Sequence, residues 1–467
     1  MKLLLRGLHV VDPRDGTVRR DQDVLVDGDL ILSVSPTAGD VPDGARLVDV
    51  AGQWAIPGFV DMHAHPLSAK DPRGALTLML AYGITGFRQL SGSDRMLKSR
   101  SGLVPDGGPR LFGMPGAVLT PANAGTAGAA IATIRAQHGL GADFIKSALV
   151  RREVFVEAQA EANRLGIAIL GHLPKGIDVA RVSADGMRSI EHLGTGVGLL
   201  SCCTPDPAAV QQEAALRPEP KLPAVKLPFL EAVLDRLVAK LVINPINLYR
   251  QPDVDLLDRT TAAFAQDAAS TLAQQLAANG TWQVPTLIRS QTQHLCDDPQ
   301  FRDDPDLRYV APATIKAWTK ATAKFSAFPA STRETFERTY ETMLRLTKLL
   351  DEAGVPLLAG SDACGAAWVV PGPSLHHELD QLAAAGLSPL RVLQTATSAA
   401  AEFLGTTSTM GTVEPGKHAD LVLLEDDPRT SVAHLHAIAG VVRQGRLLDR
   451  AELAAMKDRV AADRSVT

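Results

Sequence analysis

Short apolar runs alternate with Ala- and Leu-rich stretches along most of this 467-residue chain. Such alternation is typical of βα units, whose strands form a parallel sheet covered by helices. Eight such units close a barrel, so the pattern predicts an α/β fold with a (β/α)8 TIM barrel over residues 58–410. The expected strands are Gly58–His63, Ile84–Arg88, Arg110–Met114, Phe144–Lys146, Ala168–His172, Ser189–His192, Gln283–Leu287 and Leu357–Asp362.

The two ends of the chain carry a different pattern. Residues 1–57 hold short β-like runs separated by Gly, Asp and Pro turns, namely Leu3–Val11, Asp23–Val26 and Ile31–Val34. Residues 411–467 repeat this style in Gly411–Leu424 and Ala437–Leu448. Because the ends of a domain often lie close together, we expect both segments to form one small β-sandwich domain, followed by a C-terminal tail.

The stretch between residues 194 and 282 is too long for a simple βα connection. It contains a proline-rich piece, Arg217–Pro228, followed by amphipathic patterns at Phe229–Leu241 and Leu256–Ala278. We interpret this stretch as a helical cap inserted over the mouth of the barrel.

Charge and cysteine content limit the class of partner. A formal net charge of −5 argues against nucleic acid and anionic membranes, which require clustered positive charge. No run approaches the ~20 apolar residues of a membrane helix. The cysteines, Cys202, Cys203, Cys296 and Cys364, show no CxxC pair, which favours reduced thiols and a cytoplasmic location. We expect a small-molecule or dipeptide substrate, and a homo-oligomer because closed symmetric oligomers are common among enzymes.

The most specific local motif is Gly58–Pro66, GFVDMHAHP. His63 and His65 are two residues apart at the end of an apolar strand. Alternate residues of a strand point to the same face, so both imidazoles can bind one metal ion. Two incidental histidines would give the same motif, because HxH pairs also arise by chance.

Side chains that can bind metals recur at the ends of later strands. They are Lys146 in ADFIKSAL, His172 in IAILGHLP, His192 in SIEHLG and Asp362 in PLLAGSDA. The carboxyl ends of all barrel strands meet at one mouth, so these distant residues can form a single site. Imidazole and carboxylate ligands suit Zn²⁺ or a comparable transition ion better than Ca²⁺.

These motifs resemble the amidohydrolase superfamily, and within it the imidazolonepropionase-like and Xaa-Pro dipeptidase (prolidase-like) branch. The resemblance extends from IPGFVDMHAH through GADFIK, GHLP, EHL and GSDA to GTVEPGKHADLVLL. It implies two divalent metal ions, a carboxylated lysine as their bridge, and the following ligands: His63, His65 and Asp362 on one ion, His172 and His192 on the other, and Lys146 between them.

A carboxylated Lys146 requires a neutral amine, because an ammonium group would be repelled by two dications. Burial and neighbouring positive charge lower the pKa of a lysine, and the neutral amine then reacts with CO2 to give an anionic carbamate. If Lys146 were instead a surface or substrate-binding cation, the site would hold a single metal ion.

The resemblance also implies hydrolysis of an amide bond, in a dipeptide or an N-acyl amino acid. A hydroxide that bridges the metal ions would attack, and Asp362 would act as the catalytic proton shuttle. Candidate contacts for a substrate carboxylate are Arg289, Tyr249, Arg250 and Arg152, any of which could equally be a solvated surface residue. A cyclic-amide or lactam hydrolase, a hydrolase of carboxylate-bearing esters or mycotoxins, and a non-catalytic amidohydrolase-like scaffold remain as alternatives.

Overall fold

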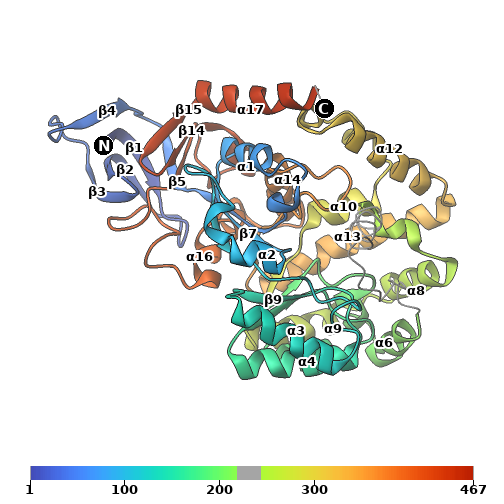
Figure 1. Cartoon of the computed structure of the whole chain (residues 1–467). Helices are drawn as coiled ribbons and strands as arrows, with labels where there is room; N and C mark the ends of the chain where they lie inside the picture. Colours follow the sequence, from blue (N-terminus) through green and yellow to red (C-terminus); the bar gives the residue numbers. More distant parts are fainter. Residues whose placement is uncertain (1, 218–242, 466–467) are drawn as a thin grey trace.

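The computed structural model describes residues 2–217 and 243–465. Both ends of the chain contribute to one eight-stranded sheet, in the order β15-β14-β13-β5-β1-β2-β3, with β4 paired to β1. In Figure 1 the blue N-terminal strands and the red C-terminal strands lie side by side in this sheet. Its strands are β1 (Lys2–Val11), β2 (Val18–Asp27), β3 (Leu30–Pro36), β4 (Ala45–Asp49), β5 (Trp54–Pro57), β13 (Leu421–Leu424), β14 (Ile438–Arg443) and β15 (Arg446–Asp449).

The expected pairing of the two chain ends is confirmed, whereas their arrangement as a β-sandwich stays a prediction. Strand β5 pairs with β1 on one side and with β13 on the other. The N-terminal and C-terminal strands are therefore joined edge to edge by backbone hydrogen bonds into one sheet. The strands of this sheet supply a hydrophobic cluster of their own, which includes Leu3, Leu5, Val24 and Val442.

A second group of strands is parallel and forms two smaller sheets. Six of the expected strands are present and end within one residue of the predicted bounds. The three-stranded sheet contains β6 (Phe59–Ala64), β7 (Ile84–Gln89) and β8 (Arg110–Gly113). The four-stranded sheet contains β9 (Phe144–Ser147), β10 (Ala168–Gly171), β11 (Ser189–Glu191) and β12 (Trp282–Val284).

Two of the expected strands differ from the structure. The strand predicted at Gln283–Leu287 ends at Val284, because Pro285 has no N–H to continue the ladder and a helix begins at Leu287. The strand predicted at Leu357–Asp362 is reduced to a single bridge between Gln283 and Leu357. The residues after Leu357 instead make separate hydrogen bonds, such as Asp362 N–H to the carbonyl of His63.

Helices connect and cover these strands. Several begin with a side-chain cap, such as Asp71, Thr126 and Asp178, each of which accepts a hydrogen bond from a first-turn amide. The helices outside the 194–282 stretch are α1 (Pro72–Ala81), α2 (Asp94–Lys98), α3 (Ala127–Gly139), α4 (Arg152–Leu165), α5 (Val179–Ala184), α10 (Leu287–His294), α11 (Pro299–Arg302), α12 (Pro312–Ser326), α13 (Ala330–Glu352), α14 (Pro373–Ala384), α15 (Pro389–Thr395), α16 (Ser398–Leu404) and α17 (Arg450–Ser465).

The described part of the 194–282 stretch is helical, as expected. It contains α6 (Pro207–Ala215), α8 (Gln251–Ala262) and α9 (Gln266–Ala278). The single helix predicted over Leu256–Ala278 is two helices, because the amide of Ala265 donates to the carbonyl of Cys203 and the chain turns there. The pattern at Phe229–Leu241, and the proline-rich piece after Arg217, lie outside the described residues.

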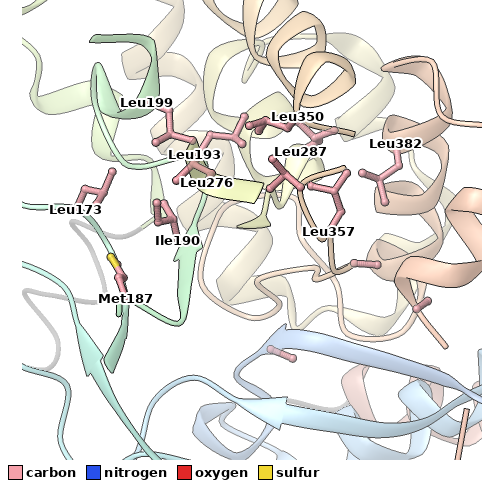
Figure 2. Close-up of a cluster of buried hydrophobic side chains, with 14 of the residues drawn as sticks. Leu173, Met187, Ile190, Leu193, Leu199, Leu276, Leu287, Leu350, Leu357 and Leu382 are labelled. Atoms are coloured by element: carbon pink, nitrogen blue, oxygen red, sulfur yellow. The ribbon is translucent and has the colours of Figure 1, made fainter. Parts of the chain in front are cut away.

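Leucine dominates the main core between the parallel strands and the helices. Figure 2 shows Leu287, Leu350, Leu357 and Leu382 together, with Leu193 and Ile190 nearby. This cluster joins the end of β12 to α10, α13 and α14. Among the described helices, none combines the length and apolar character needed to cross a membrane.

We predict that Gly360→Ala destabilises the protein. An added Cβ would lie 2.6 Å from the Cβ of His63 and 2.9 Å from its backbone nitrogen. Overpacking of this kind should lower the free energy of unfolding by about 1–3 kcal/mol, measured by urea denaturation. The control is Gly128→Ala in α3, where an added Cβ meets nothing within 4 Å and should raise that free energy by up to about 1 kcal/mol. Equal effects of the two substitutions would contradict the close packing at Gly360.

Candidate metal centre

His63 and His65, at the end of β6, are each held through Nδ1 by a neighbouring side chain. Nδ1 of His63 donates to Oε2 of Glu191 at 2.5 Å, and Nδ1 of His65 is hydrogen-bonded to Oγ of Ser91 at 2.8 Å. Their Nε2 atoms lie 3.2 Å and 2.9 Å from the same oxygen, Oδ1 of Asp362. Metal-binding histidines are held in this way, with one nitrogen on a partner and the other toward the ion.

His192 and His172 follow the next two strands of the site, β11 and β10. Nδ1 of His192 lies 2.5 Å from Oγ1 of Thr286, whose hydroxyl donates to the carbonyl of Pro285. The threonine oxygen therefore accepts the Nδ1 proton, and Nε2 of His192 is the atom that could bind a metal ion. The ring of His172 lies 4.9 Å from that of His192 between centroids. Burial lowers the pKa values of both histidines well below the usual range, which keeps them neutral.

Asp362 lies at the centre of the group. One ligand atom from each of His63, His192 and Asp362 lies within 4.8 Å of the others. Its Oδ2 forms an ion pair with Nε of Arg289. Although burial raises the pKa of Asp362, its interactions with His63 and Arg289 bring it well below the usual range. The carboxylate is therefore ionised.

Lys146, at the end of β9, is 3% exposed and directs no hydrogen bond to any described residue through Nζ. Burial lowers the pKa of its amine to about 8, against the opposing attraction of Glu191 and Asp362. A neutral amine is thus accessible near neutral pH.

The structure brings all six predicted ligands to one region, and this set of imidazoles, carboxylate and reactive amine fits a pair of divalent transition ions. Their roles as ligands remain predictions.

Three buried ionisable residues behind the ligands were not singled out from the sequence. Glu191 binds Arg88 at 3.1 Å as well as His63, and Nε of Arg88 donates to the carbonyl of Met62 at 2.7 Å. Asp61 accepts hydrogen bonds from the amides of His63 and Ser361, and so ties β6 to the segment that carries Asp362. Their only signal in the sequence is an ionisable residue inside an apolar strand, as in GFVDM, TGFRQL and SIEHL.

The predicted substrate contacts divide into two groups. Arg289 is 7% exposed and pairs with Asp362. Burial raises the pKa of Tyr249 to about 12, and the charge of Arg289 acts on the phenol in the opposite direction. Arg152 is exposed and pairs with Glu153, and Arg250 is exposed at the start of α8. The structure thus brings Arg289 to the site, places Tyr249 against Phe336, and leaves the other two arginines at the surface.

Comparison with known proteins finds a partial match to one family and a shared fold. Residues 321–448 match the model of the amidohydrolase family. A dihydroorotase of Syntrophus aciditrophicus is 38% identical over 65 residues, which are 14% of this chain and only 15% of the dihydroorotase. Among solved structures, a bottromycin amidohydrolase is 24% identical with a TM-score of 0.70, over 99% of this chain and 90% of that chain. A prolidase complexed with N-methylphosphonate-L-proline is 19% identical with a TM-score of 0.62, over 96% of this chain and all of that chain.

The resemblance to the amidohydrolase superfamily is therefore confirmed. The chain carries an amidohydrolase-family segment at residues 321–448 and has the fold of this superfamily, whose structures include prolidase-like Xaa-Pro dipeptidases. This likeness concerns the family and the fold, whereas the substrate has to be argued from the site.

We predict that Glu191→Ala destabilises the metal-free protein by about 3–5 kcal/mol, measured by urea denaturation. The substitution leaves the guanidinium of Arg88, which is 1% exposed, without its carboxylate partner. Glu153→Ala, which breaks the exposed pair with Arg152, should change stability by at most about 1 kcal/mol. The double variant Arg88→Met/Glu191→Leu should lose less than Glu191→Ala, because it buries no charge. A larger loss of stability in the double variant than in Glu191→Ala would contradict the proposal that Glu191 compensates the buried charge of Arg88.

Proposed function

We propose that this protein is a binuclear metal-dependent hydrolase that cleaves an amide bond in a dipeptide or an N-acyl amino acid. One observation carries the proposal. The Nε2 atoms of His63 and His65 both face Oδ1 of Asp362, while the Nδ1 atoms of these histidines are held by Glu191 and Ser91. Side chains from distant parts of the sequence thus direct imidazole nitrogens and a carboxylate oxygen to one point.

The proposal includes a (β/α)8 barrel over residues 58–410, a terminal β domain from residues 1–57 and 411–467, and residues 194–282 as a cap. Backbone hydrogen bonds between the two parallel sheets support a closed barrel. The amide of Asp143, just before β9, donates to the carbonyl of Met114, just after β8, at 3.1 Å. Leu358 N–H donates to Gln283 in β12, and Met62 N–H in β6 donates to Ala359. Closure would place all the strand ends at one mouth.

Two divalent ions such as Zn²⁺ would be held by the six residues in the arrangement that the resemblance implies, with His63, His65 and Asp362 on one side and His172 and His192 on the other. The buried amine of Lys146 supports its carboxylation, because nitrogen attack on CO2 forms an N–C bond, releases one proton and gives an anionic carbamate. When bound, such ions polarise the scissile carbonyl and activate a water molecule at neutral pH.

The chain's own residues would then place the substrate and move the proton. Asp362 is ionised and can accept a proton as the tetrahedral intermediate forms, and can return it to the leaving amine. A substrate carboxylate would bind the guanidinium of Arg289, beside the hydroxyl of Tyr249. The 194–282 stretch, which supplies Tyr249, would determine the shape of the substrate pocket.

Two enzymatic alternatives would use the same ligands and differ in the pocket: a cyclic-amide or lactam hydrolase, and a hydrolase of carboxylate-bearing esters or mycotoxins. The similarity of a short segment to dihydroorotases supports the first. A non-catalytic amidohydrolase-like scaffold is disfavoured, because each of the six ligand positions holds a residue type able to bind a metal. The homo-oligomer and the cytoplasmic location remain predictions.

A substrate screen tests the function directly. Protein loaded with Zn²⁺, Mn²⁺ or Co²⁺ should hydrolyse members of Xaa-Pro, Xaa-Arg or N-acyl amino acid libraries. Chromatography of the products measures the hydrolysis. Amide-blocked versions of the same compounds should react more slowly, because they lack the carboxylate for Arg289. Activity on ring amides or esters alone would favour the other enzymes, and protein without bound metal or activity would indicate the scaffold.

We further predict that Lys146→Ala removes one of two bound metal ions and lowers kcat/KM by about 100-fold or more, a loss of several kcal/mol of transition-state stabilisation. Formate or acetate should restore part of the activity by replacing the carbamate. Metal content is measured by elemental analysis, with the exposed Lys348→Ala as control. A Lys146→Ala variant that keeps both ions and the full rate would refute the bridging role.

A further inference from the structure

Helix α10 begins at the candidate centre and makes two of its contacts. Thr286, the residue before the helix, holds Nδ1 of His192 through its hydroxyl. Arg289, in the first turn, pairs with Asp362. The position of this single turn therefore fixes the orientation of a predicted ligand and the surroundings of the predicted proton shuttle.

The start of α10 has no local cap. Threonine at this position usually accepts a hydrogen bond from a first-turn amide. Thr286 is instead in the left-handed region at φ 47°, and its hydroxyl lies between His192 and the carbonyl of Pro285, so it makes no cap hydrogen bond. The first-turn residues Leu287, Ile288 and Arg289 are buried, so water is a poor substitute for the missing hydrogen-bond acceptor.

Glu378, on the neighbouring helix α14, supplies the missing acceptor. Its Oε2 accepts a hydrogen bond from the amide of Ile288 at 2.8 Å, and its side chain is fully buried. Burial raises the pKa of this carboxyl to about 8, against the opposing effect of the amides of Ile288, Leu287 and Thr286. The group is therefore mainly protonated at pH 7 and stays buried without a counter-ion.

Apolar packing alone does not set the position of α10 along its axis. Leu287 of α10 and Leu382 of α14 lie in the same leucine cluster (Figure 2), and such contacts tolerate small shifts between helices. The hydrogen bond between Glu378 and Ile288 is directional, and it acts one residue before Arg289.

We propose that Glu378 is a positioning residue: by capping α10 from α14, it holds Thr286 against His192 and Arg289 against Asp362. Glu378 makes no hydrogen bond or ion pair with a predicted metal ligand among the described residues. The catalytic consequence rests on the proposed function, whereas the cap itself does not.

Three variants test this role. Glu378→Ala removes the acceptor and Glu378→Gln keeps an acceptor oxygen of nearly the same shape. Gln381→Ala is the matched control, since Gln381 lies one turn further along α14 and accepts a hydrogen bond from the hydroxyl of Tyr340 on α13 at 2.5 Å rather than from an amide of α10. Glu378→Asp, whose carboxyl is one methylene short, replaces the alanine variant if that does not fold.

Hydrogen–deuterium exchange of the metal-free protein tests the cap. Amides of α10 should exchange about fivefold faster or more in Glu378→Ala than in the wild type, because a buried donor left without its acceptor costs about 1–3 kcal/mol and about 1.4 kcal/mol corresponds to a factor of ten. They should be unchanged in Glu378→Gln and in Gln381→Ala. Unchanged exchange in Glu378→Ala would overturn the proposal, whatever the activity.

Metal binding and kinetics test the consequence. Glu378→Ala should weaken metal affinity by about 10–100-fold, as loss of the support behind a ligand does, and should raise KM for carboxylate substrates more than for amide-blocked ones. Glu378→Gln should retain wild-type values within a few-fold, and Gln381→Ala should lower only Tm. If Glu378→Ala lowers Tm but leaves metal affinity and KM unchanged, the residue is merely structural and the proposal fails. If the wild type itself binds no metal, the proposed function fails. Hydrogen–deuterium exchange then still tests whether Glu378 caps α10.

Discussion

Ionised groups buried together must compensate one another, because an unpaired charge removed from water costs several kcal/mol. Around the candidate centre, Glu191 is matched by Arg88 and His63, and Asp362 is matched by Arg289. Lys146 has no such counter-ion at hydrogen-bond distance among the described residues, and the pKa of its amine falls to about 8. Burial thus makes the lysine the group that can lose its proton, although the charges of Glu191 and Asp362 oppose this.

The backbone shows how these side chains are turned inward. His192, Thr286 and Asp362 each have a positive φ, between 47° and 60°, just after a strand or bridge. Left-handed backbone costs a non-glycine residue roughly 1–2 kcal/mol, so it persists only where the surroundings hold it. Here the side-chain contacts of each residue provide that support: Thr286 with His192, and Arg289 with Asp362. The polar contacts of the site therefore stabilise the strained backbone that turns these side chains inward.

The predicted ligands could be found from the sequence because each stands at the end of an apolar run, which is a local signal. His63 and His65 are the plainest case, since their spacing alone places them on one face. Glu191, Arg88 and Glu378 could not be assigned in this way. The pair Arg88–Glu191 joins residues 103 positions apart, and Glu378 caps a helix 90 positions earlier, so their roles depend on tertiary arrangement. The strand predicted at Gln283–Leu287 is too long for a local reason instead, because Pro285 lacks the N–H that would continue the ladder.

Arg289 connects the two functions that the proposed reaction would require. Its Nε pairs with Asp362, and an arginine presents five N–H donors in one plane, so the terminal nitrogens would remain for a substrate carboxylate. A bound carboxylate would reduce the positive field that Arg289 exerts on Asp362. Because that field keeps the pKa of Asp362 low, binding of the correct substrate would raise the basicity of the carboxyl that must accept the proton. Substrate recognition and proton transfer would then be coupled through a single guanidinium, whose position depends on the first turn of α10.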